Sequence, residues 1–152
     1  MAAQAHSDGP RLFTVEQANA LVPTLQLEFG RLAHLRGEVS AVVEALGGPD
    51  EAMAYLEERN PAKQGLEAKV EQFRRLVSEI NGVVQRVNDL GCLVKDLEMG
   101  LVDFLSMRGE EAVFLCWQFG EPAVAHWHPV DEGFAGRQPL EDVVAQRPEF
   151  LN

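Results

Sequence analysis

The sequence predicts an α+β protein in which a long antiparallel helical hairpin packs with a small four-stranded antiparallel β-meander. Two observations support this fold class. Between residues 14 and 90, apolar residues recur at alternating intervals of three and four positions, which is the spacing of an amphipathic helix. After Gly91 the spacing changes to two, in short runs that end at glycines, as expected for strands joined by tight turns. The helices should therefore come first along the chain and the sheet second.

The chain has the length and composition of one domain. Its 152 residues, 46% of them hydrophobic, are typical of a chain that folds around a single core. We therefore expect a single domain over residues 1–152, with residues 1–11 as a disordered lead-in and residues 129–152 as a tail that wraps over the sheet. The helical hairpin should occupy residues 14–90 and the meander residues 92–128.

The first helix of the hairpin is expected over residues 14–46. Thr14 is a suitable N-cap, and Gln17 three positions later completes a capping box. Pro23 lies inside this helix and removes a backbone donor, so we expect a kink there. The apolar seam consists of Ala18, Val22, Leu25, Phe29, Leu32, Val39, Val43 and Leu46.

The second helix is expected over residues 62–90, after a connector over residues 47–61 that includes a short marginal helix. Its apolar seam has the regular spacing of a coiled coil and consists of Leu66, Val70, Phe73, Val77, Ile80, Val84 and Val87. Leu76, Val83 and Leu90 add a flanking stripe, which makes the apolar face wider than one neighbouring helix and a small sheet would cover. We therefore expect these three side chains at an interface between chains, most simply in a two-fold dimer.

Four short runs rich in β-branched and aromatic residues follow, each bounded by residues typical of turns. The strands are expected at residues 92–97, 101–105, 112–117 and 122–128. The third run is apolar on both faces, so it should lie centrally in the sheet.

Charge and composition exclude several classes of partner. Acidic residues outnumber basic ones by 24 to 13, and the net charge of −11 opposes binding to nucleic acid or to an anionic membrane. No secretory signal pattern and no apolar run of about 18 residues is present, so we expect a cytoplasmic protein that does not enter a membrane. Cys92 and Cys116 lack the spacing of a disulfide framework or a zinc knuckle and are expected to be free, buried thiols.

Four segments of the chain resemble one known family. They are TVEQANALVP (14–23), GCLVKDLEMGLVDF (91–104), VFLCWQFGE (113–121) and WHPVDEGFAGRQPL (127–140). In these segments the chain is similar to an uncharacterised bacterial family, domain-of-unknown-function family 2203. The resemblance implies a fold and a set of recurring positions, and it implies no activity, substrate or cofactor. It places His128 within the family pattern and His126 outside it, and Pro129 stands where members often carry an acid.

A metal site is one hypothesis for the sheet. His126 and His128 are two residues apart on an expected strand, so both side chains leave the same face, while Trp127 should face the core. Asp103 and Asp131 are plausible carboxylate partners, although strand order decides whether Asp103 comes near. Such a mixed ligand set suits one divalent transition metal, namely zinc, manganese or iron. The alternative interpretation is a solvated histidine pair on an acidic surface.

Two basic residues are candidates for binding an anion or another ligand. Arg137 follows Gly133 and Gly136 in a loop whose backbone amides and guanidinium would suit an anion. The alternative is that Phe134 packs on the sheet while Arg137 pairs with a nearby acid. Lys95 lies on the first expected strand, and the alternative to ligand binding there is a cross-strand ion pair with a carboxylate.

The sequence therefore supports two functional hypotheses from different classes. In the first, the protein is a self-associating or partner-binding module that uses the heptad-patterned hairpin. In the second, it is a small divalent-metal-binding protein or metal-dependent enzyme with a His/carboxylate site on the sheet. Whether the protein is an enzyme, and on what substrate, does not follow from these residues.

Overall fold

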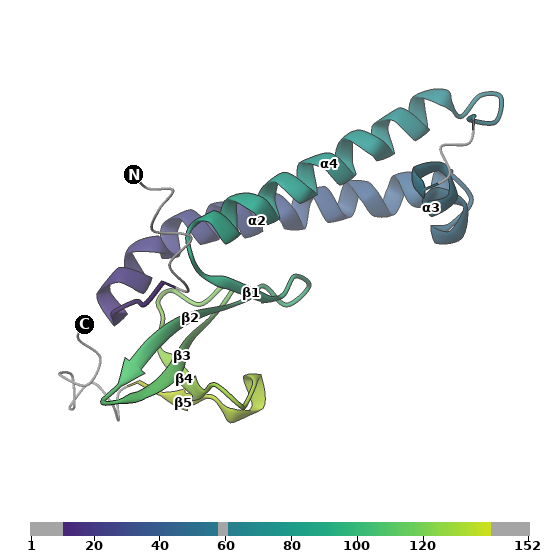
Figure 1. Ribbon diagram of the computed structural model, residues 1–152. Coiled ribbons are helices and arrows are strands. Elements are labelled where there is room, and N and C mark those ends of the chain that lie inside the picture. Colours follow the sequence, from purple (N-terminus) through teal and green to yellow (C-terminus); the bar gives the residue numbers. More distant parts are fainter. Residues whose placement is uncertain (1–10, 58–60, 141–152) are drawn as a thin grey trace. The chain divides into compact units, whose positions relative to one another are not determined.

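The computed structural model describes residues 11–57 and 61–140 of the chain. In these residues three helices precede five strands and a short 3-10 helix, which confirms the α+β class (Figure 1). The bounds are α2 (Val15–Ala45), α3 (Pro49–Glu57), α4 (Glu67–Asp89), β1 (Leu93–Asp96), β2 (Leu101–Arg108), β3 (Glu111–Gln118), β4 (His126–Pro129), η1 (Phe134–Gly136) and β5 (Gln138–Pro139). Helix α3 lies in the connector, where a short marginal helix was expected, and five strands replace the expected four. That α2 and α4 form one long hairpin stays a prediction. The lead-in before residue 11 and the tail beyond residue 140 lie outside the described residues.

Helix α2 begins and ends as its sequence predicts. The backbone amide of Gln17 donates to Thr14 Oγ1 at 3.0 Å, and the amide of Thr14 donates to Gln17 Oε1 at 2.9 Å, so the capping box is present. Pro23 lies within the helix and does not end it. At the C-terminal end, Gly47 has a φ of 105°, and the amide of Gly48 donates to the Val43 carbonyl at 2.9 Å. Only glycine takes that φ without strain, which explains where the helix stops.

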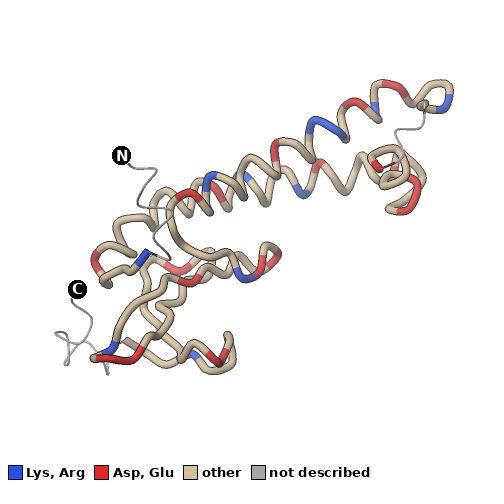
Figure 2. The backbone as a smooth tube through the Cα atoms, in the orientation of Figure 1, with Lys and Arg blue, Asp and Glu red and all other residues tan. Residues whose placement is uncertain are grey.

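The chain divides into two compact units, and residues 28–85 form one of them. Arg31 on α2 lies 3.6 Å from Glu79 on α4, and Arg74 on α4 donates to the carbonyl of Tyr55 on α3 at 3.0 Å. Acidic and basic residues are interspersed along α4, as on the solvated side of an amphipathic helix (Figure 2). Among the described residues, none of the helices has the length and apolarity that crossing a bilayer would need.

The burial of Leu76, Val83 and Leu90 bears on the interface that was expected at these residues. Leu76 and Val83 are each 1% exposed in the single chain, and Leu90 is only partly exposed. The surplus of apolar surface from which an interface was expected is therefore absent at Leu76 and Val83. Self-association itself stays a prediction, but it has lost the observation on which it rested.

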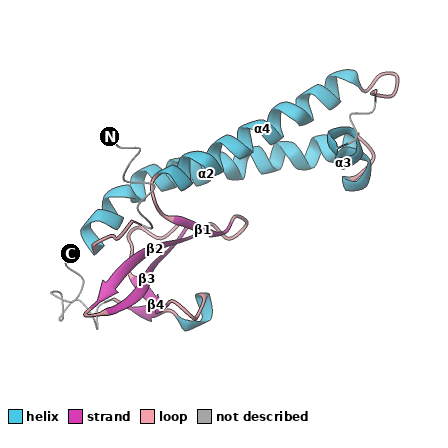
Figure 3. Cartoon of the chain, in the orientation of Figure 1, coloured by secondary structure: helices cyan, strands magenta, loops and turns pink. Residues whose placement is uncertain are grey.

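The second unit contains the sheet, together with the first part of α2 and the end of α4. The strands follow one another in the order β1-β2-β3-β4-β5, and every neighbouring pair is antiparallel, so the expected meander is confirmed (Figure 3). Phe13, just before α2, contacts β2. The amide of Phe13 donates to the Leu105 carbonyl at 2.8 Å, and the Phe13 ring lies 5.1 Å from the ring of Phe104. Asn19 on α2 accepts a hydrogen bond from the amide of Val124 at 2.7 Å.

The fourth and fifth strands differ from the sequence prediction. Strand β4 begins only at His126, because residues 122–125 form a bend and an irregular segment after the turn that ends β3. Strand β5 was not expected, since it consists of Gln138 and Pro139 alone and proline is rare within strands. It pairs with β4, and the amide of Leu140 donates to the Ala125 carbonyl at 2.9 Å, which fixes this part of the tail along the sheet edge.

Candidate metal centre

The strand register places the polar candidates on one face of the sheet. Asp103 on β2 is opposite Cys116 on β3, and Cys116 is opposite His126 on β4. His128 lies two residues further along β4, so its side chain leaves the same face as that of His126. Trp127 pairs with Leu115, which pairs with Phe104, and these apolar side chains occupy the other face. The alternation of β2 and β4 predicted this division correctly.

Three of these polar side chains form a buried cluster. His128 Nε2 lies 3.0 Å from Asp103 Oδ2, and both side chains are 3% exposed. Cys116 is buried beside them, and the potential ligand atoms of Asp103, Cys116 and His128 all lie within 4.8 Å of one another. Each residue comes from a different strand, so the cluster exists only when β2, β3 and β4 pair in this register.

A backbone carbonyl orients the imidazole of His128. Its Nδ1 lies 2.8 Å from the carbonyl oxygen of Pro129, and because a carbonyl only accepts, Nδ1 carries the hydrogen. Nε2 is therefore the atom directed at Asp103, and it binds either a proton or a cation there. The ring of Phe114 lies 5.6 Å away, centroid to centroid, on the same face.

The thiol of Cys116 is not activated as a free nucleophile. Burial, reinforced by the negative charge of Asp103, raises the pKa of Cys116 to about 12. At neutral pH the sulfur is thus protonated unless a cation replaces the proton. Burial likewise raises the pKa of Cys92 to about 11, and that thiol donates to the Val87 carbonyl at 3.4 Å.

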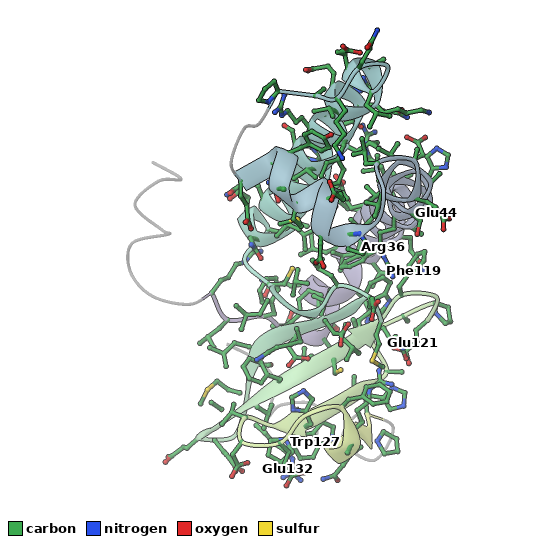
Figure 4. All side chains as sticks on the ribbon, turned by 90° about the vertical axis from the view of Figure 1, so that its right-hand side faces the viewer. Arg36, Glu44, Phe119, Glu121, Trp127 and Glu132 are labelled. Atoms are coloured by element: carbon green, nitrogen blue, oxygen red, sulfur yellow. The ribbon has the colours of Figure 1, made fainter. Side chains whose placement is uncertain are left out.

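A cavity of about 90 Å³ adjoins the cluster. Asp103, Cys116 and His128 line one part of it, and Lys95, Glu132 and Phe134 line another. Figure 4 shows Glu132 on the segment that leads into η1. The cluster therefore faces a small space instead of being closed on all sides by side chains.

The other two predicted ligands lie elsewhere. The side chain of His126 is one-third exposed, and its Nδ1 is 3.8 Å from Glu121 Oε2. Asp131 is exposed on the loop after β4 and is not part of the cluster. Of the four residues proposed as metal ligands from the sequence, the structure thus brings together Asp103 and His128.

Arg137 pairs with a nearby acid, which was one part of the alternative to anion binding, whereas Phe134, expected to pack on the sheet, is exposed. The Arg137 guanidinium lies 2.8 Å from Glu121 Oε1, donates to the Cys116 carbonyl at 3.3 Å, and stacks 4.8 Å from the centroid of Phe134. Burial acts to raise the pKa of Glu121, but hydrogen bonds from Arg137 and from the Gln118 amide outweigh it and hold that pKa below its usual range. These contacts fix η1 against the sheet.

The sequence interpretation missed Cys116. Cys116 lacks the spacing of a disulfide framework or a zinc knuckle, and it was therefore expected only as a free, buried thiol. A usable signal was present, because Trp117 next to it is the larger apolar residue and takes the core side, which sends Cys116 to the polar face. That Cys116 lies opposite Asp103 could be known only from the register of the β2–β3 pair.

Comparison with known proteins identifies the family. The family model for the uncharacterized conserved protein DUF2203 matches residues 11–140, and the chain therefore belongs to this family. Searches of curated proteins and of solved structures gave no match. The family assignment supplies no chemistry for the cluster.

Proposed function

We propose that this protein binds one divalent transition-metal ion through Asp103, Cys116 and His128. The observation that carries the proposal is the buried convergence of a carboxylate, a thiol and an imidazole, with all ligand atoms within 4.8 Å of one another. Ligands bound tetrahedrally to zinc lie roughly 3.5 Å apart, given bond lengths of about 2.0 to 2.3 Å. The separations among the three ligand atoms thus differ from that spacing by about 1.3 Å at most.

The hydrogen bond to Pro129 supports His128 as a ligand. Metal-binding histidines commonly donate their second ring nitrogen to a carbonyl or carboxylate, which fixes the tautomer and aims the free lone pair at the ion. The 2.8 Å contact between Nδ1 and the Pro129 carbonyl has this form. It leaves Nε2 as the donor atom on the side of Asp103 and Cys116.

The chemistry of the ligands favours zinc or ferrous iron. A thiolate is a soft ligand that suits zinc and iron better than manganese, and the imidazole and carboxylate are compatible with both. The metal would also resolve two unfavourable features of the buried site, since it takes the place of the proton on the Cys116 sulfur and neutralises Asp103. The competing explanation is a metal-free imidazolium–carboxylate pair with a neighbouring neutral thiol.

Metal content separates these two explanations. The protein would be purified without a histidine tag, dialysed against zinc, and analysed by mass spectrometry for bound metal. We expect one equivalent of zinc in the parent protein and a large loss in Cys116→Ser and Asp103→Asn, which keep the side-chain shapes. Cys92→Ser and His126→Ala are the matched controls, because each removes a group of the same type outside the cluster.

Two results would refute the proposal. One is a parent protein that retains far less than one equivalent and whose melting temperature zinc does not change. The other is equal loss of zinc in His126→Ala and Asp103→Asn, which would make His126 a ligand and refute the proposed set of three.

A further inference from the structure

The cavity beside the cluster indicates what the proposed metal would bind, and this step rests on the metal proposal above. We propose that the ion keeps one coordination position open to the cavity and there binds a small oxyanion, such as the carboxylate group of a small organic acid. Lys95 supplies the attracting charge and Glu132 the opposing one. The number of protein ligands, the size of the cavity and the charges of Lys95 and Glu132 lead to this assignment.

The number of protein ligands leaves a position free. Zinc sites that are purely structural hold four protein ligands, whereas sites with three keep the fourth position for water or substrate. Among the described residues, the cluster offers only Asp103, Cys116 and His128. Because the same three side chains line the cavity, the open position faces that space.

The size of the cavity limits the ligand. A volume of about 90 Å³ holds a few water molecules and is smaller than the roughly 150 Å³ cavity that accommodates benzene. A group of three or four heavy atoms fits beside the ion, and anything larger must remain outside the mouth. Carboxylate and similar oxyanions have this size and provide an oxygen donor.

The charge of a ligand at the metal should be felt mainly by the charged side chains around the cavity. The carboxylate of Asp103 and the thiolate of Cys116 together neutralise a divalent ion, so the ligand's attraction depends on nearby charges. The ammonium of Lys95 lies 4.8 Å from the ring centroid of Phe114, whose ring neighbours that of His128. This cation–π contact holds a positive charge at the wall of the cavity.

Glu132 contributes the opposite charge at the same cavity. Its side chain packs close to Gly136, which leaves no room for a Cβ at that position. Glu132 lines the cavity and is not part of the ligand cluster. An anion at the metal should be attracted by Lys95 and repelled by Glu132, and substitutions at the two positions should act in opposite directions.

Cobalt-loaded protein provides the test, because the visible absorption of Co²⁺ reports its coordination. The protein would be loaded with Co²⁺ and titrated with sodium formate, and separately with sodium azide, at constant ionic strength. We expect saturable spectral changes with both probes. Lys95→Met should weaken formate binding roughly three- to tenfold, and Glu132→Gln should strengthen it by a similar factor. Lys69→Met is the control, since Lys69 is exposed on α4 and does not line the cavity.

The outcomes distinguish this inference from the proposal on which it rests. If Co²⁺ does not bind to the parent protein, the metal proposal itself fails. If Co²⁺ binds, loses affinity in Cys116→Ser, and yet shows no spectral response to either anion, the site is closed and only the present inference is overturned. Equal formate affinity in Lys95→Met and Lys69→Met would also overturn it.

Discussion

Replacing His128 with alanine should destabilise the metal-free protein by about 3 to 5 kcal/mol. The imidazole and the Asp103 carboxylate are 3.0 Å apart and each is 3% exposed, so neither charge is screened by solvent. Removing one partner of such a pair leaves the other charge buried without compensation, which is what costs this amount. The Cys116 thiol also faces Asp103 and should keep the loss toward the lower end of that range.

Asp103→Asn should behave differently in the two backgrounds. In the parent protein an asparagine amide can donate to a neutral Nε2 of His128, so the exchange should cost about 1 kcal/mol, the value of one altered hydrogen bond. In the His128→Ala background the same change removes an unpaired buried charge and should restore stability by about 1 to 2 kcal/mol. The effect of Asp103→Asn is thus expected to change sign.

Urea denaturation in EDTA, followed by circular dichroism, measures all four proteins of this double-mutant cycle. The coupling should be about 2 to 3 kcal/mol in favour of the pair. A coupling near zero, with Asp103→Asn destabilising both backgrounds equally, would refute the argument that these groups form a charged pair. His126→Ala should cost far less than His128→Ala, since its side chain is one-third exposed.

Three further predictions concern the turn before β2 and the thiols. Gly100→Ala should cost more stability than Gly109→Ala in the same denaturation assay: both have positive φ, but a Cβ at Gly100 would lie 2.5 Å from Phe119 Cβ, whereas nothing lies within 4 Å at Gly109. Iodoacetamide at pH 8 should modify Cys116 only on unfolding, because a pKa of about 12 leaves roughly one thiolate in ten thousand; rapid alkylation of the native protein would contradict this. Zinc affinity should rise at least about tenfold per pH unit between pH 6 and 8, since zinc must displace the Cys116 proton, and a pH-independent affinity would exclude that residue as a ligand.

Much of the fold follows from periodicity, because burial repeats with the geometry of each element. The capping box at Thr14, the glycine-terminated α2 and the meander order all have local signals in the sequence. Strand β5 has no such local signal, because its two residues reach β4 only as a result of how the preceding loop folds. The burial of Leu76 and Val83 likewise depends on tertiary packing, which a helical pattern does not specify.

The candidate site shows the same division between local and non-local information. Alternation along β2 correctly sends Asp103 to the face opposite Phe104, and alternation along β4 separates His128 from Trp127. Alternation says nothing about which residues meet across strands. Cys116 enters the site only because it pairs directly with Asp103, and that pairing comes from the register of the β2–β3 hairpin.

The choice between the two histidines follows from neighbours that a two-residue spacing does not reveal. His126 is directly opposite Cys116, and its Nδ1 lies 3.8 Å from Glu121 Oε2, a carboxylate that Arg137 also contacts. His128 is opposite Phe114 and therefore diagonal to Cys116. Side chains at diagonal positions of neighbouring strands remain within reach of each other. The Pro129 carbonyl accepts from Nδ1 of the His128 ring and so orients the ring with Nε2 toward Asp103. An HxH pattern on a strand therefore supplies two imidazoles on one face, and at His128 the carbonyl bound to Nδ1 directs Nε2 to the cluster.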